Sequence, residues 1–268
     1  MTSEAVALFD GGLRAMRRSI VAWSISLAAL VAATVAFWPA FRGASGISEA
    51  IDSLPGAVVD AFGLQDFGTP AGFLRGNLYE LFVPLLFSVA AVALVNGQTA
   101  SDESAGRLEL FLSQPVGRRT LFLARVTACL VGLAGIVVAT VVVQLAMNGV
   151  VGLSIDAGAV VQTASLCGLL AAFHGSVAYL VACLWPRPSL VLGAGVTLTL
   201  GGYVVAALFP ISSLLRPWKS LSPWDWALGG NPLEHGAEPW RYLALAVPAI
   251  VLALLGALVV ERRDVAAA

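Results

Sequence analysis

Six long apolar runs, separated by five polar stretches, constrain this chain more than any other feature of its sequence. They lie at residues 19–38, 79–97, 121–147, 159–184, 189–209 and 242–260. Each run is close to or above the roughly 20 residues that a helix needs to cross a hydrocarbon layer of about 30 Å. The runs are continuous rather than alternating, so helices are the practical way to satisfy the backbone in lipid. The sequence predicts an all-α polytopic membrane protein with six transmembrane helices in a single domain, 1–268.

Charged residues make up only 12% of the chain, against about 25% in a typical soluble domain, and their distribution predicts the orientation. Six crossings put both termini on the same side of the membrane. Ten of the 15 Lys and Arg residues lie in the loops and tails of that side, which the positive-inside rule makes cytoplasmic. We expect a multi-pass protein of the cell (plasma) membrane, surrounded by membrane lipids, with both termini in the cytoplasm.

Residues 1–18 predict an amphipathic helix before the first span. Apolar residues from Val6 to Ile20 recur at intervals of three and four, so they share one side of a helix, while Arg14 and Arg18 point elsewhere. A helix of this kind lies in the membrane interface with its basic side toward anionic headgroups. A simple cytoplasmic extension of the first span is the alternative.

The loop at 39–78 is too short and too apolar for an independent domain, and we expect it to rest on the outer surface. Its amphipathic stripe is interrupted by Pro55, which favours two short helical pieces over one. Thr69 and Pro70 fit an N-cap followed by a proline at the first helical position. This pair predicts that a helix restarts there and enters the second span.

Residues 210–241 form an outer segment rich in proline and tryptophan. It contains four of the seven tryptophans: Trp218, Trp224, Trp226 and Trp240. Indoles prefer the headgroup level, and the capping-box pattern that begins at Ser222 predicts a helix start. We expect one or two short helices that dip into the outer interface as a re-entrant segment; a plain loop with a tryptophan belt is the alternative.

Small residues recur at every fourth position within the fourth and fifth spans. The three rows are Gly168, Ala172 and Ser176; Cys167, Ala171 and Gly175; and Gly193, Thr197 and Gly201. Such rows let helices approach closely, so they predict a tight helix bundle. The three cysteines lie inside spans as an odd, dispersed set, which indicates apolar packing. We expect no metal site.

The most informative polar stretch is 98–119, between the second and third spans. Charged residues alternate in it with apolar residues from Leu108 to Leu112, until Pro115 ends the pattern. This pattern predicts a short amphipathic helix on the cytoplasmic side, too charged to cross and too apolar for a free linker. Something must cover its apolar side, either the headgroup layer or a partner protein.

This stretch resembles the ATP-binding cassette (ABC) transporter permeases of the bacterial type-two exporter family, which export drugs, antibiotics or lipids and have the type V fold. Those permeases typically carry an acidic pair, then GTLEL, then a PVSRR turn. Here GRLEL stands at 106–110 and PVGRR at 115–119. The departures are Ser104 and Ala105 after the acidic pair, and Arg107 in place of the common Thr. The predicted layout, including an Arg-Arg-Asp ending at 262–264, agrees over essentially the whole chain.

The resemblance implies that the cytoplasmic helix is a coupling helix that docks on a separate nucleotide-binding ATPase subunit. The residues that it implies for this contact are Asp102, Glu103, Gly106, Arg107, Glu109, Phe111, Arg118 and Arg119. It also implies that the outer segment is a gate. The gate residues would be Trp224, Trp226, Gly229 and Gly230, with the two glycines forming a turn.

The chain carries no ATP site of its own, because its only lysine is Lys219 in the outer segment and a phosphate loop requires one. We therefore expect no enzymatic activity, no cofactor and no nucleic acid on this chain, with ATP and magnesium on the partner ATPase. The expected assembly pairs the chain with a second permease copy or paralogue, forming a dimer. It would export an amphipathic or lipid-like substrate from a bacterial cell.

Polar side chains within the spans mark a possible substrate path. They are Gln144, Gln162, His174 and Tyr179. His174 is either a hydrogen-bonded structural residue or a substrate or proton site. No Asp, Glu, Lys or Arg occupies the middle of a span, although proton- or ion-coupled secondary carriers usually keep such residues there; a carrier or another membrane-complex subunit remains an alternative.

A rhomboid-type intramembrane serine protease is the other alternative, because it is also built on six spans. A G-x-S-G string surrounds Ser45, and His174 lies in a span. A serine–histidine pair requires hydrogen-bond reach, and no feature of the sequence brings these two residues together.

Overall fold

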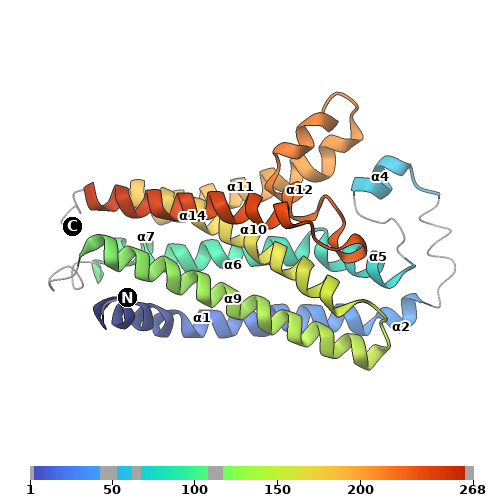
Figure 1. The fold of residues 1–268 in the computed structure, drawn as a ribbon, viewed down its shortest axis with the longest axis horizontal. Helices are drawn as coiled ribbons and strands as arrows, with labels where there is room; N and C mark the ends of the chain where they lie inside the picture. The colour runs from blue at the N-terminus through green and yellow to red at the C-terminus, as the bar shows by residue number, and fades with distance from the viewer. Residues whose placement is uncertain (1–2, 43–52, 62–67, 108–116, 263–268) are drawn as a thin grey trace.

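The apolar runs form long helices in the computed structural model of the chain (Figure 1), which describes residues 3–42, 53–61, 68–107 and 117–262. Within these ranges every regular element is helical. Six segments are long and apolar enough to span a membrane: Glu4–Phe41, Pro70–Ser104, Arg118–Val151, Ala157–Leu184, Pro188–Ile211 and Pro239–Arg262. Each contains one predicted run, so the prediction of an all-helical chain with six long apolar helices is confirmed.

The six main helices run side by side in an elongated bundle (Figure 1). They are α1 (Ser3–Ala36), α6 (Phe82–Gln98), α9 (Arg118–Val151), α10 (Ala157–Leu184), α11 (Pro188–Leu208) and α14 (Pro239–Arg262). Helix α10 is central and packs against α6, α9, α11 and α14, whereas α1 packs mainly along α9.

The two ends of the bundle differ in the short helices that they carry (Figure 1). Helix α7 (Ala100–Ser104) lies at the same end as the start of α1 and the end of α14; we call this the α7 end. Helices α2 (Trp38–Phe41) and α12 (Pro223–Leu228) lie at the opposite end, which we call the α12 end. The predicted topology, with both ends of the chain on the coupling-segment side, agrees with this arrangement.

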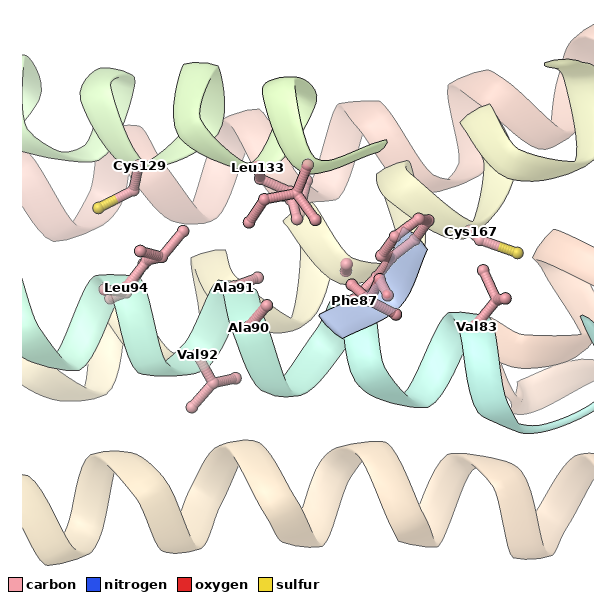
Figure 2. Close-up of a cluster of buried hydrophobic side chains, with 14 of the residues drawn as sticks. Val83, Phe87, Ala90, Ala91, Val92, Leu94, Cys129, Leu133 and Cys167 are labelled. Atoms are coloured by element: carbon pink, nitrogen blue, oxygen red, sulfur yellow. The ribbon is translucent and has the colours of Figure 1, made fainter. Parts of the chain in front are cut away.

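The buried face of α6 forms much of the core. Figure 2 shows Phe87 and Leu94 on the side of α6 that faces α9, where Leu133 belongs to the same buried cluster. Val92 points to the other side, toward α11 (Figure 2). A Cβ on Gly195 of α11 would lie 2.6 Å from Val92 Cγ1, so this glycine permits the close approach of α11 to α6.

Two of the three small-residue rows pack inside the bundle as predicted. A Cβ on Gly168 would lie 3.0 Å from a side chain of α9, and one on Gly175 would lie 3.3 Å from a side chain of α6. The third row does not pack within this chain. Gly193 and Gly201 of α11 are exposed, and among the described atoms none lies within 4 Å of a Cβ built on either. The bundle prediction was wrong for this row, because it faces away from α6 and α10.

One continuous helix replaces the predicted division between an interfacial helix at 1–18 and a span at 19–38. Helix α1 runs from Ser3 to Ala36 without a break. The expectation of a separate helix is wrong, and the extension of the first span is what the structure shows. The apolar side of the early turns packs on α9 rather than facing headgroups: Met16 is 5% exposed, and its Sδ lies 3.6 Å from Cys129 Sγ.

The loop after α2 shows the predicted helix starts that fall within the described residues. Helix α4 (Gly56–Ala61) begins directly after Pro55. The Thr69 hydroxyl accepts a hydrogen bond from the N–H of Gly72 at 3.1 Å and so caps α5 (Pro70–Leu74). The first predicted piece of the stripe lies largely in residues that the structure does not describe.

The second span is interrupted before α6 begins. After the π-helical turn η1 (Arg75–Tyr79), Leu81 leaves the helical conformation with φ −135° and ψ −58°. Pro84 explains the break, because it offers no N–H to the carbonyl of Glu80 and its ring clashes with the preceding turn. The sequence analysis treated residues 79–97 as an uninterrupted span and did not anticipate this discontinuity.

The outer segment folds into four short helices rather than the one or two predicted. They are η2 (Phe209–Ile211), η3 (Arg216–Leu221), α12 (Pro223–Leu228) and α13 (Pro232–His235). The predicted helix start at Ser222 is confirmed, since its hydroxyl accepts from the N–H of Trp224 at 3.2 Å. The same hydroxyl donates to the carbonyl of Gly202 at 2.6 Å, which ties α12 to α11.

Candidate functional site

The predicted coupling segment begins with a bend at the end of α6. Thr99 takes φ −125° and ψ −96°, and its hydroxyl donates to the carbonyl of Val95 at 2.6 Å. Helix α7 then runs for five residues against α6 and α11 and ends before Gly106, whose φ is +70°. A glycine in this left-handed conformation terminates a helix. The expected single helix over 98–119 is therefore broken at both Thr99 and Gly106.

Asp102 is the electrostatic centre of this segment. Its Oδ2 lies 3.0 Å from Arg125 Nη2, and its Oδ1 lies 2.7 Å from Arg107 Nη2. Arg125 also donates from Nη1 to the carbonyl of Gln98 at 2.6 Å. The Arg125 side chain is only 4% exposed and that of Asp102 is 14% exposed. This buried pair fixes α7, and the end of α6, to α9.

The other predicted coupling residues lie around this pair. Arg107 is 56% exposed and bonds Asp102 from the solvent side. Arg118 and Arg119 form the first turn of α9. Glu109 and Phe111 fall among the residues that the structure does not describe. The structure thus brings Asp102 and Arg107 together, while contact with an ATPase subunit remains a prediction.

Arg125 is the residue of this cluster to which the sequence analysis gave no role. The available signal was an arginine two turns inside an apolar helix, since a charge at that depth requires a partner. The acidic residues of the preceding polar stretch, Asp102, Glu103 and Glu109, were the candidates for that partner.

Trp224 is buried inside the protein rather than exposed on its surface, and its gate role stays a prediction. Its side chain is 2% exposed, and its indole N–H donates to the carbonyl of Thr199 in α11 at 3.0 Å. A Cβ on Gly202 would lie 2.9 Å from the indole, so the glycine makes room for it. Trp226 is half-buried, and its ring meets Phe173 of α10 edge-on at 6.2 Å. Packing against α10 and α11 buries the apolar surface of these indoles, and the N–H of Trp224 still finds a hydrogen-bond acceptor.

Arg241 holds the C-terminal end of α12. Its Nη1 donates to the carbonyl of Asp225 at 2.9 Å and to that of Trp226 at 3.1 Å, and its Nε lies 3.0 Å from a Glu238 carboxylate oxygen. Gly229 and Gly230 form the predicted turn after α12. A Cβ on Gly230 would overlap the Arg241 guanidinium, so this turn and the cap depend on each other.

The four polar residues of the predicted substrate path have separate structural partners. Gln144 accepts from the Tyr79 hydroxyl at 2.6 Å, and Gln162 accepts from the N–H of Ala237 at 2.8 Å. The ring of Tyr179 packs on Gly256 of α14, where a Cβ would lie 2.5 Å away. Gln162 thus links α10 to the outer segment, and a substrate path through these residues stays a prediction.

His174 is fully buried between α6, α10 and α11. Its Nδ1 lies 2.9 Å from Ser88 Oγ and 3.3 Å from Thr199 Oγ1. Because the Ser88 hydroxyl donates to the carbonyl of Pro84 at 2.7 Å, it is the acceptor from the imidazole rather than a proton donor to it. The structure therefore favours the structural reading of His174. Ser45, the serine of the protease alternative, lies outside the described residues.

The family model of the multidrug efflux system permease Rv1217c, C-terminal domain, matches residues 7–260. The chain belongs to this family of ABC exporter permeases. A comparison with curated protein sequences gives no match.

The family match covers nearly the whole chain, including α7, the Asp102–Arg125 pair and the outer segment. The permease is therefore a multi-pass membrane protein and the permease domain of a multidrug efflux system, a transport subunit that works with partner subunits. The resemblance noted from residues 98–119 is confirmed.

Proposed function

We propose that this permease couples ATP hydrolysis by a separate nucleotide-binding subunit to the efflux of an amphipathic or lipid-like substrate across the plasma membrane. The observation that carries the proposal is the buried pair of Asp102 and Arg125, which joins a short surface helix to two long spans. A multidrug efflux permease needs such an element, because its energy source lies outside the membrane.

The pair gives α7 two mechanical connections. The chain leads from α7 directly into α6, and Arg125 holds α7 to α9 through Asp102 and the Gln98 carbonyl. A partner that moves α7 would displace both spans together, because a buried ion pair with a backbone hydrogen bond resists separation. Arg107 is exposed and Glu103 is partly exposed, so a docking partner could reach both.

ATP and magnesium would be bound by the partner subunit. The single lysine of this chain, Lys219, lies at the α12 end of the bundle. Helix α7 is at the opposite end. A phosphate loop needs a lysine beside a glycine-rich turn. The permease would accordingly be non-catalytic, with both termini and α7 facing the cytoplasm, as its basic residues predict.

A second permease copy or a paralogue would complete the pathway. The exposed row of Gly193, Thr197 and Gly201 on α11 supports this, since small residues on a lipid-facing helix allow another helix to approach closely. Helix α11, which carries this row, also contacts α7 and α12. A partner seated on α11 would therefore be next to both ends of the proposed transport route.

Co-expression of the chain with the ATPase encoded beside it tests the central claim. We expect a detergent-stable complex that survives affinity purification and hydrolyses ATP. A permease that never retains this ATPase, under conditions where each protein alone is folded, would refute the proposed coupling.

Replacing Glu103 and Arg107 with alanine tests the docking surface. Neither side chain belongs to the buried Asp102–Arg125 pair, so folding and insertion should remain intact. We expect basal ATPase activity to persist while stimulation by substrate is lost. Normal stimulation and normal transport by the double variant would remove these residues from the mechanism.

The gate proposed for the outer segment must involve α11, because Ser222 and Trp224 bond its backbone. Cysteines introduced at the exposed Ser220 and the buried Ala227 report on it, in a chain whose native cysteines are replaced. We expect Ala227→Cys to be labelled from outside faster in the ATP-trapped state than without nucleotide. Equal rates in both states would make the segment a static cover.

A further inference from the structure

A cavity of about 300 Å³ lies at the α12 end of the bundle. Its walls come from the break between η1 and α6, the last turns of α11, η3 and α12. Neither the coupling segment nor the predicted substrate path includes it. Four charged side chains line it: Arg75, Glu80, Lys219 and Asp225.

Three of these four charges are engaged by a partner. Lys219 Nζ lies 3.2 Å from Asp225 Oδ1, and Arg75 Nη1 lies 3.8 Å from a carboxylate oxygen of Glu234. Glu80 differs, because among the described residues its carboxylate forms no ion pair within 4 Å and no hydrogen bond. Arg75 and Lys219 attract it electrostatically from farther away.

Neither of the two cations that line the cavity is paired with Glu80. Lys219 pairs with Asp225, and Arg75 pairs with Glu234, which lies outside the cavity lining. A charge beside a low-dielectric protein interior is stabilised by a counter-ion. The open counter-ion position lies at Glu80, and a ligand with one positive charge would fill it.

The backbone at Glu80 also marks a binding position. Glu80 is the last residue before the interruption at Leu81, and Pro84 leaves its carbonyl without the usual amide partner. Interrupted helices at membrane depth are tolerated where they line a cavity, and in transporters such breaks point to substrate sites. The charge and the break therefore converge on the same cavity wall.

Aromatic walls and size narrow the ligand further. Tyr203 and Trp224 both line the cavity, with ring centroids 5.2 Å apart, and aromatic faces attract organic cations. Pockets that enclose a drug-sized ligand range from about 300 to 1,000 Å³, so this one fits a headgroup rather than a whole large molecule. An apolar hollow of about 370 Å³ also lies against α11, lined by Val205, Phe209 and Trp218 among others, and its lining suits an alkyl chain.

We propose that this cavity binds the cationic headgroup of an amphipathic ammonium compound, with Glu80 as its counter-ion and Tyr203 and Trp224 as its walls. The inference deepens the proposed export function and rests on it, because it assigns a charge to the exported class. Lys219 opposes the ligand, since it adds positive charge to the same cavity.

Binding to the purified full-length chain in neutral dodecyl maltoside micelles tests this proposal without ATPase or nucleotide. Decyltrimethylammonium and decyldimethylphosphine oxide share a chain length and a similar head size but differ in charge. Isothermal titration below their critical micelle concentrations, corrected for empty micelles, should show saturable binding of the ammonium compound alone. Displacement of the ammonium probe by dihexanoyl phosphatidylcholine would identify a lipid headgroup as the source of the ammonium group. If this lipid does not displace the probe, the ligand is a free amphipathic cation.

Two variants should change the affinity for the ammonium compound in opposite directions. Glu80→Gln should weaken ammonium binding roughly tenfold or more, since it removes the counter-ion. Lys219→Gln should tighten it, a direction that misfolding cannot produce. Glu238→Gln is the control, because Glu238 is an exposed carboxylate of the same outer segment outside the cavity.

Equal binding of the charged and neutral probes, or unchanged affinity in both Glu80→Gln and Lys219→Gln, would overturn the proposal. These results are independent of the ATPase. Failure of the co-purification experiment with normal ammonium binding would reject only the coupling, and the reverse result would reject only the cavity.

Discussion

Asp102 binds two arginines whose exposure differs greatly, and this difference decides what each contributes. The Arg107 side chain is 56% exposed, while that of Arg125 is 4% exposed. An exposed ion pair contributes about 0–1 kcal/mol. Removing one partner of a buried pair costs roughly 3–5 kcal/mol, because the other charge is left without compensation.

Asp102→Asn should therefore destabilise the permease by roughly 3 kcal/mol or more, whereas Arg107→Gln should cost less than about 1 kcal/mol. Urea unfolding of the purified permease in micelles, followed by the loss of helical circular dichroism, measures both. Similar stability losses for the two variants would show that Arg125 does not depend on Asp102.

Gly230 is a second residue whose side-chain size matters. A methyl group there would displace the Arg241 guanidinium from the end of α12, so Gly230→Ala should destabilise by about 1–3 kcal/mol. Gly201→Ala is the matched control, because its Cβ meets no described atom within 4 Å and alanine favours a helix. Thermal unfolding of both variants compares them, and an equally stable Gly230→Ala protein would contradict the steric argument.

At the scale of elements, α12 is attached to the bundle by a few identifiable hydrogen bonds. Trp224→Phe keeps most of the buried ring and removes only the indole N–H that bonds the Thr199 carbonyl. We expect it to raise the rate at which a cysteine at Ala227 is labelled from outside, with little change at Ser220, which is already exposed. No change at Ala227 would mean that this bond does not hold α12 in place.

The elements that the sequence predicted well are those defined by local pattern. Apolar length gave the six long helices, and the proline-linked caps at Thr69 and Ser222 gave two helix starts. The break at Leu81 was also local, since Pro84 causes it, but the continuous apolar run concealed it. A proline five residues after the start of a run is compatible with an intact span whenever neighbouring helices compensate.

The misplaced elements are those that depend on contacts between distant segments. Arg125 contacts Asp102 across a loop, and Trp224 contacts Thr199 between two helices. Neither pair is separated by a helical or strand repeat, so periodicity in the sequence does not predict the contact. The headgroup preference of indoles gave no reason to expect that Trp224 is buried beside Gly202. Both contacts depend on tertiary packing.

At the scale of the whole molecule, the exposed row on α11 predicts how two permeases associate. Gly201→Ile adds a bulky side chain to a surface with no neighbour in this chain, so the fold should tolerate it while close approach of a second helix is blocked. Native mass spectrometry of the wild-type permease should show dimers that this variant loses. Dimers of normal abundance in the variant would place the interface on another helix.

The packing of α1 almost entirely on α9 affects how the chain is made. Helix α1 ends at residue 36, whereas its partner is complete only at residue 151. At synthesis rates of about 5–20 residues per second, the first span waits roughly 6–23 seconds in the membrane before its partner arrives. Only the much weaker contacts with the second span are available to it in the meantime. The side of α1 that packs on α9 therefore has no partner from this chain until the third span leaves the ribosome.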